Sequence, residues 1–192
     1  IGLFGFSCHD GNVVELMNRA AEIGAPGIDA IQFRYSFAQY GDLALNNAID
    51  ACRKAGIGLI AMKTQASVPE DFERVQQFRS KEFTLPQAKL KAVWADERID
   101  AAVSSMKNIT QLEENVAAAK SQTELAMSDF MQLNHYASET AHHRCLGCSH
   151  HCEQGAHDSS HIATRLRYLM YAQCYGEHEK ARALYQALNV DP

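Results

Sequence analysis

The chain of 192 residues is long enough for one domain with a substantial core, and 46% of its residues are hydrophobic, as in ordinary globular proteins. Its formal net charge of -5 is small and its 18 Lys and Arg residues are scattered, which excludes a basic stripe for nucleic acid or a polybasic membrane patch. No apolar run reaches transmembrane length, so we expect neither nucleic acid nor membrane as a partner.

The chain begins with the apolar, glycine-containing residues 1–6, without a methionine and without the basic and then apolar profile of a signal peptide. These residues are typical of a buried strand. We therefore expect the sequence to be a fragment of a longer protein whose true N-terminus is missing.

A strand followed by a helix recurs along the first part of the chain. Short apolar runs bounded by glycine or polar residues predict strands at 1–6, 28–33, 58–62 and 99–103. Apolar residues at helical spacing predict helices at 13–23, 42–55, 69–78, 85–94 and 109–119. This alternation predicts an α/β fold with a parallel sheet.

The number of strand-helix units restricts the choice of α/β fold. A closed (β/α)8 barrel needs eight strands and about 250 residues, so this chain holds half a barrel with open edges. An open doubly wound sheet is the alternative, but the glycine-rich phosphate loop expected after its first strand is absent.

From residue 123 onward the sequence predicts helices alone, at 124–143, 160–174 and 177–188. Gly176 separates the last two of these helices. We therefore divide the chain into a partial barrel domain at residues 1–122 and an all-helical, cysteine-bearing extension at residues 123–192.

The stretch Cys145-Leu-Gly-Cys148-Ser-His-His-Cys152 is the one place where strong metal ligands lie close together in sequence. Its short spacers allow one turn to aim successive thiolates at a single point, and Cys174 is the candidate for a fourth ligand. Spacing alone fits structural zinc as well as an iron-sulfur cluster, and zinc could also use nearby histidines: His142, His143, His150, His151, His157 and His161. Clustered cysteines suit a reducing compartment, so we expect a cytoplasmic protein.

Four further segments share a pattern: Ile1-Gly-Leu-Phe-Gly-Phe-Ser7-Cys-His9, Ile28-Asp-Ala-Ile-Gln32-Phe-Arg-Tyr35-Ser36, Ala55-Gly-Ile-Gly-Leu-Ile-Ala-Met62-Lys63 and Ser105-Met-Lys107-Asn108-Ile-Thr-Gln111-Leu-Glu-Glu114-Asn115. Together they resemble strands five to eight of the aldo/keto reductase family, over roughly residues 1–120. The resemblance implies the C-terminal half of a (β/α)8 TIM barrel. The tail resembles the iron-sulfur extension of a bacterial branch of that family, which implies a 4Fe-4S cluster on Cys145, Cys148, Cys152 and Cys174.

The same resemblance implies an oxidoreductase that transfers hydride between NAD or NADP and a small carbonyl or alcohol substrate. Ser7 and Gln32 match positions that hold the nicotinamide carboxamide. The adenosine end is expected on a loop and helix start that suit a phosphate, formed by Ser105, Lys107, Asn108, Gln111, Glu114 and Asn115. Lys107 is the one nearby charge for a 2′-phosphate, which leaves NAD and NADP both open. A cluster would also allow a redox partner.

The family's proton-donating tyrosine and its lysine, aspartate and histidine helpers lie on strands two to four, which this sequence does not contain. We therefore assign no catalytic residue and expect the chain alone to be inactive. Met62 stands where the family often has an aromatic residue that stacks on the nicotinamide. The alternative from another class of protein is a non-catalytic scaffold module that binds zinc or a cluster.

Overall fold

The structure is a computed structural model that describes residues 2–9, 11–65, 77–141, 152–154 and 161–188. Within these residues, four parallel strands form one sheet: β1 (Gly5–Cys8), β2 (Ala30–Arg34), β3 (Gly58–Met62) and β4 (Ala101–Ala102). The strands lie in the order β1-β2-β3-β4, so each one pairs with its neighbours in the chain. A doubly wound sheet reverses this order at a switch point, whereas successive units of a (β/α) barrel keep it. The predicted parallel α/β pattern is confirmed, and its strand order is consistent with a partial barrel.

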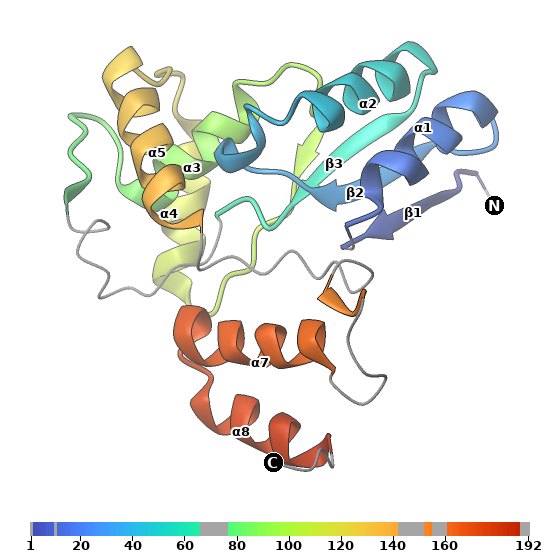
Figure 1. Cartoon of the computed structure of the whole chain (residues 1–192). Coiled ribbons are helices and arrows are strands. Elements are labelled where there is room, and N and C mark those ends of the chain that lie inside the picture. Colours follow the sequence, from blue (N-terminus) through green and yellow to red (C-terminus); the bar gives the residue numbers. More distant parts are fainter. Residues whose placement is uncertain (1, 10, 66–76, 142–151, 155–160, 189–192) are drawn as a thin grey trace.

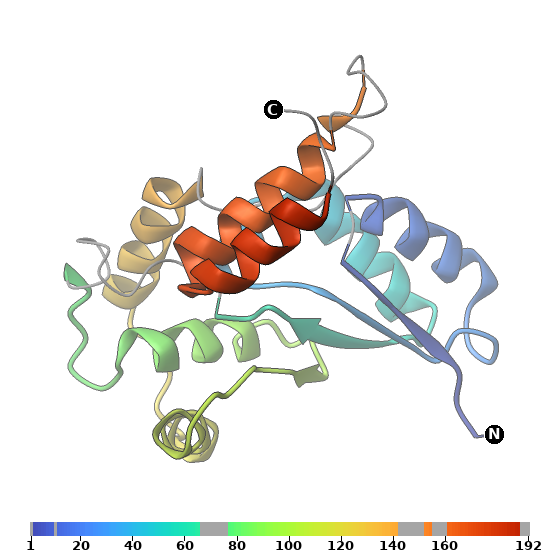
Figure 2. The ribbon, with the colours of Figure 1, turned by 90° about the horizontal axis from the view of Figure 1, so that it is seen from below.

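Helices alternate with the strands and then continue without them. The alternating helices are α1 (Val13–Ile23), α2 (Leu43–Lys54), α3 (Leu85–Trp94) and α4 (Ile109–Lys120), with the short 3₁₀ helix η1 (Phe37–Gln39) before α2. The helices that follow are α5 (Met127–Glu139), α7 (Ile162–Tyr175) and α8 (His178–Ala187). Figure 1 shows α1 and α2 beside the sheet and the α7–α8 pair below it, and Figure 2 shows α7 and α8 packed side by side.

Hydrophobic periodicity predicted most of these elements. The helices α1 and α3 and the strand β3 begin and end at the predicted residues, α2 is shorter than the prediction by one residue at each end, and α4 is longer by one residue. The helical C-terminal part is also confirmed, with α5 shorter than the predicted 124–143. Of the predicted helix 69–78, residues 69–76 lie outside the described part of the chain.

Three predicted strands need correction. β1 is Gly5–Cys8 rather than 1–6, β2 is Ala30–Arg34 rather than 28–33, and β4 is shorter than the predicted 99–103. Before β1, the Phe4 N–H donates to Asp29 Oδ2 at 2.7 Å, and the Phe4 carbonyl accepts from the Asp29 N–H at 2.7 Å. The apolar run in the sequence therefore begins before Gly5, the first residue of β1 that pairs with β2.

The main hydrophobic core lies between the sheet and the helices α1 and α2. Its buried members include Met17, Ala20, Leu45, Ala48, Ile49 and Cys52 from the helices and Ile31, Phe33, Leu59 and Ala61 from the strands. Side chains alternate between the two faces of a strand, so Gln32 and Ile60 belong to the face opposite this core. The face of the sheet covered by α1 and α2 is apolar, and the side chains of the opposite face are not part of this core.

A second apolar cluster attaches α5 to the strand-helix units. Leu133 and Tyr136 of α5 pack with Phe37 of η1 and with Leu85 and Ala88 of α3. Such contacts between buried aromatic and aliphatic side chains hold a helix in place more firmly than surface polar contacts do. The division of the chain at residues 122 and 123 stays a prediction, and α5 packs on the strand-helix part.

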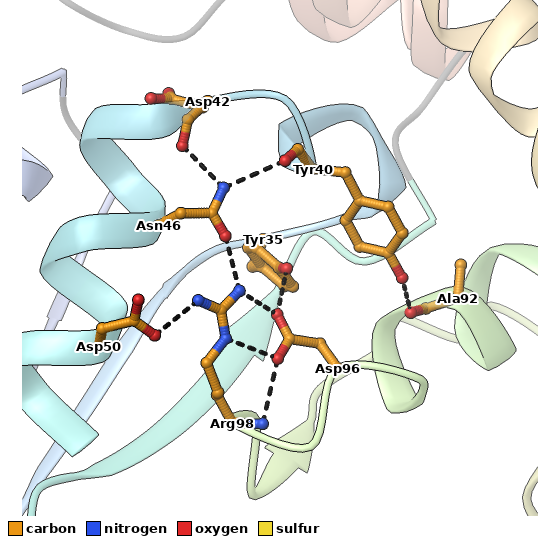
Figure 3. A network of polar contacts seen from close by, with 8 residues as sticks. All are labelled: Tyr35, Tyr40, Asp42, Asn46, Asp50, Ala92, Asp96 and Arg98. Atoms are coloured by element: carbon orange, nitrogen blue, oxygen red, sulfur yellow. Dashed lines mark hydrogen bonds and ion pairs between the residues drawn. The ribbon is translucent and has the colours of Figure 1, made fainter. Parts of the chain in front are cut away.

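A polar network centred on Arg98 joins α2, the end of β2 and the segment that leads into β4 (Figure 3). The Arg98 guanidinium donates to Asp96 Oδ1 and Oδ2, both at 2.8 Å, to Asp50 Oδ1 at 2.8 Å and to Asn46 Oδ1 at 2.6 Å. The hydroxyl of the fully buried Tyr35 donates to Asp96. These bonds fix three segments that are far apart in the sequence.

Electrostatics keep Asp96 ionised inside this network. Burial alone would raise the pKa of its carboxyl, but hydrogen bonds from Arg98 and Tyr35 outweigh burial and hold the pKa below its ordinary value. Burial, and then the hydrogen bond to Asp96, raises the pKa of Tyr35, so its hydroxyl remains a donor. A carboxyl whose folded pKa is lowered stabilises the fold above its unfolded pKa, and that contribution is lost as the pH falls through the folded pKa.

We therefore predict that Asp96→Asn lowers the free energy of unfolding at pH 7 by about 1–3 kcal/mol, because it removes the charge that two donors share. The difference in unfolding free energy between wild type and Asp96→Asn should become smaller below pH ~4, where the wild-type carboxyl takes up a proton. Urea unfolding at both pH values measures this. Asp50→Asn is the control, since Asp50 is an exposed partner of the same Arg98 and should cost less. Equal losses of unfolding free energy in the two variants would contradict the role assigned to Asp96. So would a difference between wild type and Asp96→Asn that does not change with pH.

Candidate functional site

The carboxyl ends of the four strands meet at one edge of the sheet, which is where α/β proteins bind ligands. Ser7 of β1 pairs in register with Gln32 of β2, and Gln32 pairs with Ile60 of β3. All three belong to the face opposite the α1 and α2 core. The structure thus brings together the two residues predicted to hold a carboxamide.

Gln32 has a weak hydrogen-bond partner. Its Nε2 donates to the Met62 sulfur at 3.5 Å, and a thioether is a poor acceptor. Ser7 is exposed, and among the described residues its hydroxyl makes no hydrogen bond. A carbonyl oxygen supplied by a ligand would be a better acceptor for the Gln32 amide than the Met62 sulfur is. The donor set therefore fits a carboxamide ligand.

The predicted adenosine-end residues surround the beginning of α4. Asn108 is the N-cap, and its Oδ1 accepts from Gln111 N at 2.9 Å, while Gln111 Oε1 accepts from Lys107 N at 2.8 Å. These two bonds fix the turn between β4 and α4. Ser105 and Lys107 are exposed on that turn. A capped helix start with an exposed lysine beside it can accept a phosphate.

Glu114 and Asn115 are held by protein contacts. Asn115 is buried, its Oδ1 accepts from Gln65 Nε2 at 2.9 Å, and its Nδ2 donates to Ser104 Oγ at 3.3 Å. The Glu114 carboxylate accepts from the Thr84 hydroxyl at the start of α3. Asn115 is therefore a buried residue that links the loops that follow β3 and β4 and holds them in position.

A charged cluster at this edge was missed by sequence reasoning. Lys63, directly after β3, places its Nζ 5.9 Å from the centre of the Tyr175 ring at the end of α7. Lys180 Nζ lies 2.8 Å from Glu177 Oε2 and 4.7 Å from the centre of the Tyr171 ring. No sequence signal could have found it, because lysine and tyrosine carry no spacing pattern and the contact joins β3 to α7.

The predicted metal ligands are only partly described. Cys145 and Cys148 lie outside the described residues. Cys152 lies near the start of α7, because Oε1 of the adjacent Glu153 accepts from Ala163 N at 2.9 Å. Cys174 is buried in the last turn of α7, and burial raises the pKa of its thiol. At a rise of about 1.5 Å per residue, the helix separates Ala163 and Cys174 by about 16 Å.

A single zinc ion or cluster requires its thiolates within a few ångströms of each other. Cys152 and Cys174 are both described but Cys145 and Cys148 are not, so the set of four cysteine ligands stays a prediction. Within the described ranges, His, Cys, Asp and Glu side chains form no group of three that could hold a metal. Cys52 is a core thiol: burial raises its pKa to about 11, and its Sγ donates to the Met17 carbonyl at 3.3 Å.

Comparisons with known proteins add little to this geometry. Neither protein-family models nor curated protein sequences gave a match. Among solved structures, the chain is similar to a thermostable aldo-keto reductase in complex with the inhibitor epalrestat, at 18% identity and a TM-score of 0.44 over 69% of this chain and 47% of that one. The chain thus spans about half the length of that solved structure.

None of the helices in the described residues is long and apolar enough to cross a lipid bilayer.

Lys63 has a backbone conformation that can be tested directly. Its φ of 58° is in the left-handed region, which L side chains avoid at a cost of roughly 1–2 kcal/mol. We predict that Lys63→Gly is more stable than Lys63→Ala by about 1 kcal/mol, since both variants lose the charge and only glycine tolerates this φ. Chemical denaturation measures the difference.

The control for this pair is Lys54, in the last turn of α2. There the order should reverse, with Lys54→Ala more stable than Lys54→Gly by up to about 1 kcal/mol, because glycine weakens a helix. If alanine is at least as stable as glycine at position 63, the left-handed conformation of Lys63 is wrong.

Proposed function

We propose that this chain is the dinucleotide-holding part of an oxidoreductase similar to the aldo/keto reductases. The observation that carries the proposal is the paired position of Ser7 and Gln32 on the face opposite the helix core, with the exposed Lys107 and the capped start of α4 at the same edge of the sheet. The proposal extends the sequence resemblance, which covers the same residues.

Each group has a defined task in this proposal. Gln32 Nε2 exchanges its weak contact with the Met62 sulfur for the carboxamide oxygen of the nicotinamide, and the Ser7 hydroxyl completes the carboxamide contact. Lys107 and the first amides of α4 bind a phosphate at the adenosine end. When bound, the nicotinamide ring supplies or accepts the hydride. These residues orient that ring and none of them transfers a proton, so the chain holds the cofactor without carrying the catalytic set.

We predict weak but measurable NADP⁺ binding by the purified chain, since only part of a full barrel's cofactor contacts is present. Gln32→Ala should weaken binding by about five- to tenfold, because it removes one hydrogen bond worth about 1 kcal/mol. Asn115→Ala should weaken it too, because the loops after β3 and β4 lose their shared anchor. Isothermal titration calorimetry gives the dissociation constants.

Gln122→Ala is the matched control, since Gln122 is exposed beyond the end of α4 and far from the first turn of that helix. Its dissociation constant should equal that of the wild type. Unchanged binding in both Gln32→Ala and Asn115→Ala, with folded protein by circular dichroism, would remove the cofactor assignment.

We propose further that Cys145, Cys148, Cys152 and Cys174 form a metal site in the C-terminal part of the chain. Their spacing and the resemblance support a 4Fe-4S cluster, with zinc as the alternative, and the histidines around them could supply a ligand to zinc. Cys145 and Cys148 lie outside the described residues, so no chemical step is assigned to this site. A zinc- or cluster-binding scaffold without catalysis remains the alternative function.

We predict that Cys152→Ser and Cys174→Ser each lose bound metal, because each removes one thiolate from the proposed ligand set. Anaerobically purified protein should be assayed for iron, acid-labile sulfide and zinc. A brown protein with equal iron and sulfide indicates a cluster, and a colourless zinc-loaded protein indicates the alternative. Metal kept by Cys174→Ser would end the claim for Cys174 alone, and a wild type without metal would end the proposal.

A further inference from the structure

The sheet ends on each side in a strand that has a neighbour on one side only. β1 pairs with β2 and β4 pairs with β3, and within the described residues no further strand joins either of them. Phe6 of β1 and Ala102 of β4 lie at the margin of the main core and are only partly buried. Because the unpaired backbone of such a strand can accept another strand, these two outer strands are open to pairing.

A row of apolar side chains is exposed on α4, the helix that follows β4. Ile109, Leu112 and Val116 recur at helical spacing and are 68%, 42% and 39% exposed. The buried residues of this helix, Asn115 and Ala118, belong to a different part of its surface. Ile109, Leu112 and Val116, which we call the α4 stripe, therefore form an apolar surface that the described chain does not cover.

The order of the strand-helix units shows which contact the α4 stripe lacks. Met17 and Ala20 of α1, the helix after β1, share the main core with Ile31 and Phe33 of β2, the next strand. The helix after β4 is α4, and no strand follows it among the described residues. The α4 stripe is therefore exposed where a further parallel strand beside β4 would cover it.

The strand β1 has the properties that this position requires. It runs parallel to the other strands and is open on its outer side, and the apolar Leu3 and Phe4 just before it are exposed. Within one chain, β2 and β3 lie between β1 and β4, so these two strands do not meet. The β1 strand of a second copy has no such obstacle.

Two copies also have the right number of strands. A two-fold axis that runs along the strands keeps all of them parallel, and it pairs β4 of each copy with β1 of the other. Four strands from each copy give the eight that close a (β/α) barrel. The same rotation pairs both outer strands of each sheet at once, so the assembly is closed and does not grow into a chain.

We propose that two copies of this chain associate through their outer strands and form one closed, eight-stranded parallel barrel. In this dimer β4 pairs with the partner's β1, and the α4 stripe packs on the partner's Leu3 and Phe4. Burial of these side chains provides the driving force, and backbone hydrogen bonds between the outer strands set the direction of pairing. The inference does not depend on the dinucleotide proposal, because none of its contacts involves a ligand.

The mass of the purified chain in solution is the first test. Analytical ultracentrifugation should show a dimer of the 21.3 kDa chain. Leu112→Glu should weaken dimerisation by about tenfold or more, because it places a charge in an apolar contact. Leu43→Glu is the matched control, since Leu43 is an exposed leucine at the start of α2, between the two inner strands in chain order. Its dimerisation should equal that of the wild type.

A mixture of two variants tests which surfaces meet. Phe4→Lys should weaken dimerisation as Leu112→Glu does, although the two positions are on opposite sides of the sheet. A mixture of the two variants should dimerise more tightly than either variant alone, because one of its two contacts is native and the other places Glu beside Lys. Circular dichroism checks that each variant is folded, and Ile109→Glu replaces Leu112→Glu if the latter does not fold.

Several results would overturn the inference. A wild type that stays monomeric at every concentration would mean that a different polypeptide pairs with the outer strands. Assemblies larger than a dimer would contradict closure at eight strands. An equal loss of dimerisation in Leu43→Glu, a dimer that is unaffected by Phe4→Lys, or a mixture that dimerises no better than its components would show that the copies meet through other surfaces.

Discussion

Parallel pairing of consecutive strands is the constraint on which the rest of this structure depends. Because β1, β2, β3 and β4 run in the same direction and in sequence order, every crossover returns to the same edge, and all four carboxyl ends open on one side. Ser7, Gln32, Lys63 and Lys107 gather there for that reason alone. The topology of the sheet therefore determines where these four side chains lie.

The polar network around Arg98 and the second apolar cluster keep that edge in place. Arg98 and Asp96 hold the segment before β4 against α2 and against Tyr35 at the end of β2 (Figure 3). Lys89 Nζ, buried in α3, donates to the Tyr136 hydroxyl at 3.1 Å and so reinforces the packing of α5. Removing one partner of such a buried hydrogen bond costs more free energy than the bond itself contributes, because the other partner is left unsatisfied. These contacts are therefore cooperative.

The apolar pattern was sufficient to predict the bounds of the helices α1 and α3 and of the strand β3. The apolar spacing of Val13–Ile23 and the continuous apolar run Gly58–Met62 are local properties, and the structure reproduces both ranges. Leu3 and Phe4 show the limit of this signal: they are apolar but 77% and 61% exposed, because pairing with β2 begins only at Gly5. Strand ends depend on a partner strand that a local pattern does not contain.

The candidate site could be predicted only where a motif existed. Ser7, Gln32 and the segment from Ser105 to Asn115 carry a family pattern, although the structure gives Asn115 a positioning task that the pattern does not reveal. Lys63 and Tyr175 had no such pattern, since their contact arises from the position of α7 beside the end of β3. The fourth-ligand role of Cys174 stays a prediction, because Cys145 and Cys148 lie outside the described residues.

The proposed dinucleotide site lies at the carboxyl edge of the parallel sheet. Backbone amide shifts of the full chain, recorded by NMR as NADP⁺ is added, report binding residue by residue. We expect saturable shifts concentrated at Ser7, at Gln32 and in residues 105–110. Shifts confined to the opposite ends of the strands, at Gly5, Ala30 and Gly58, or no saturable shift at all, would contradict the proposed site.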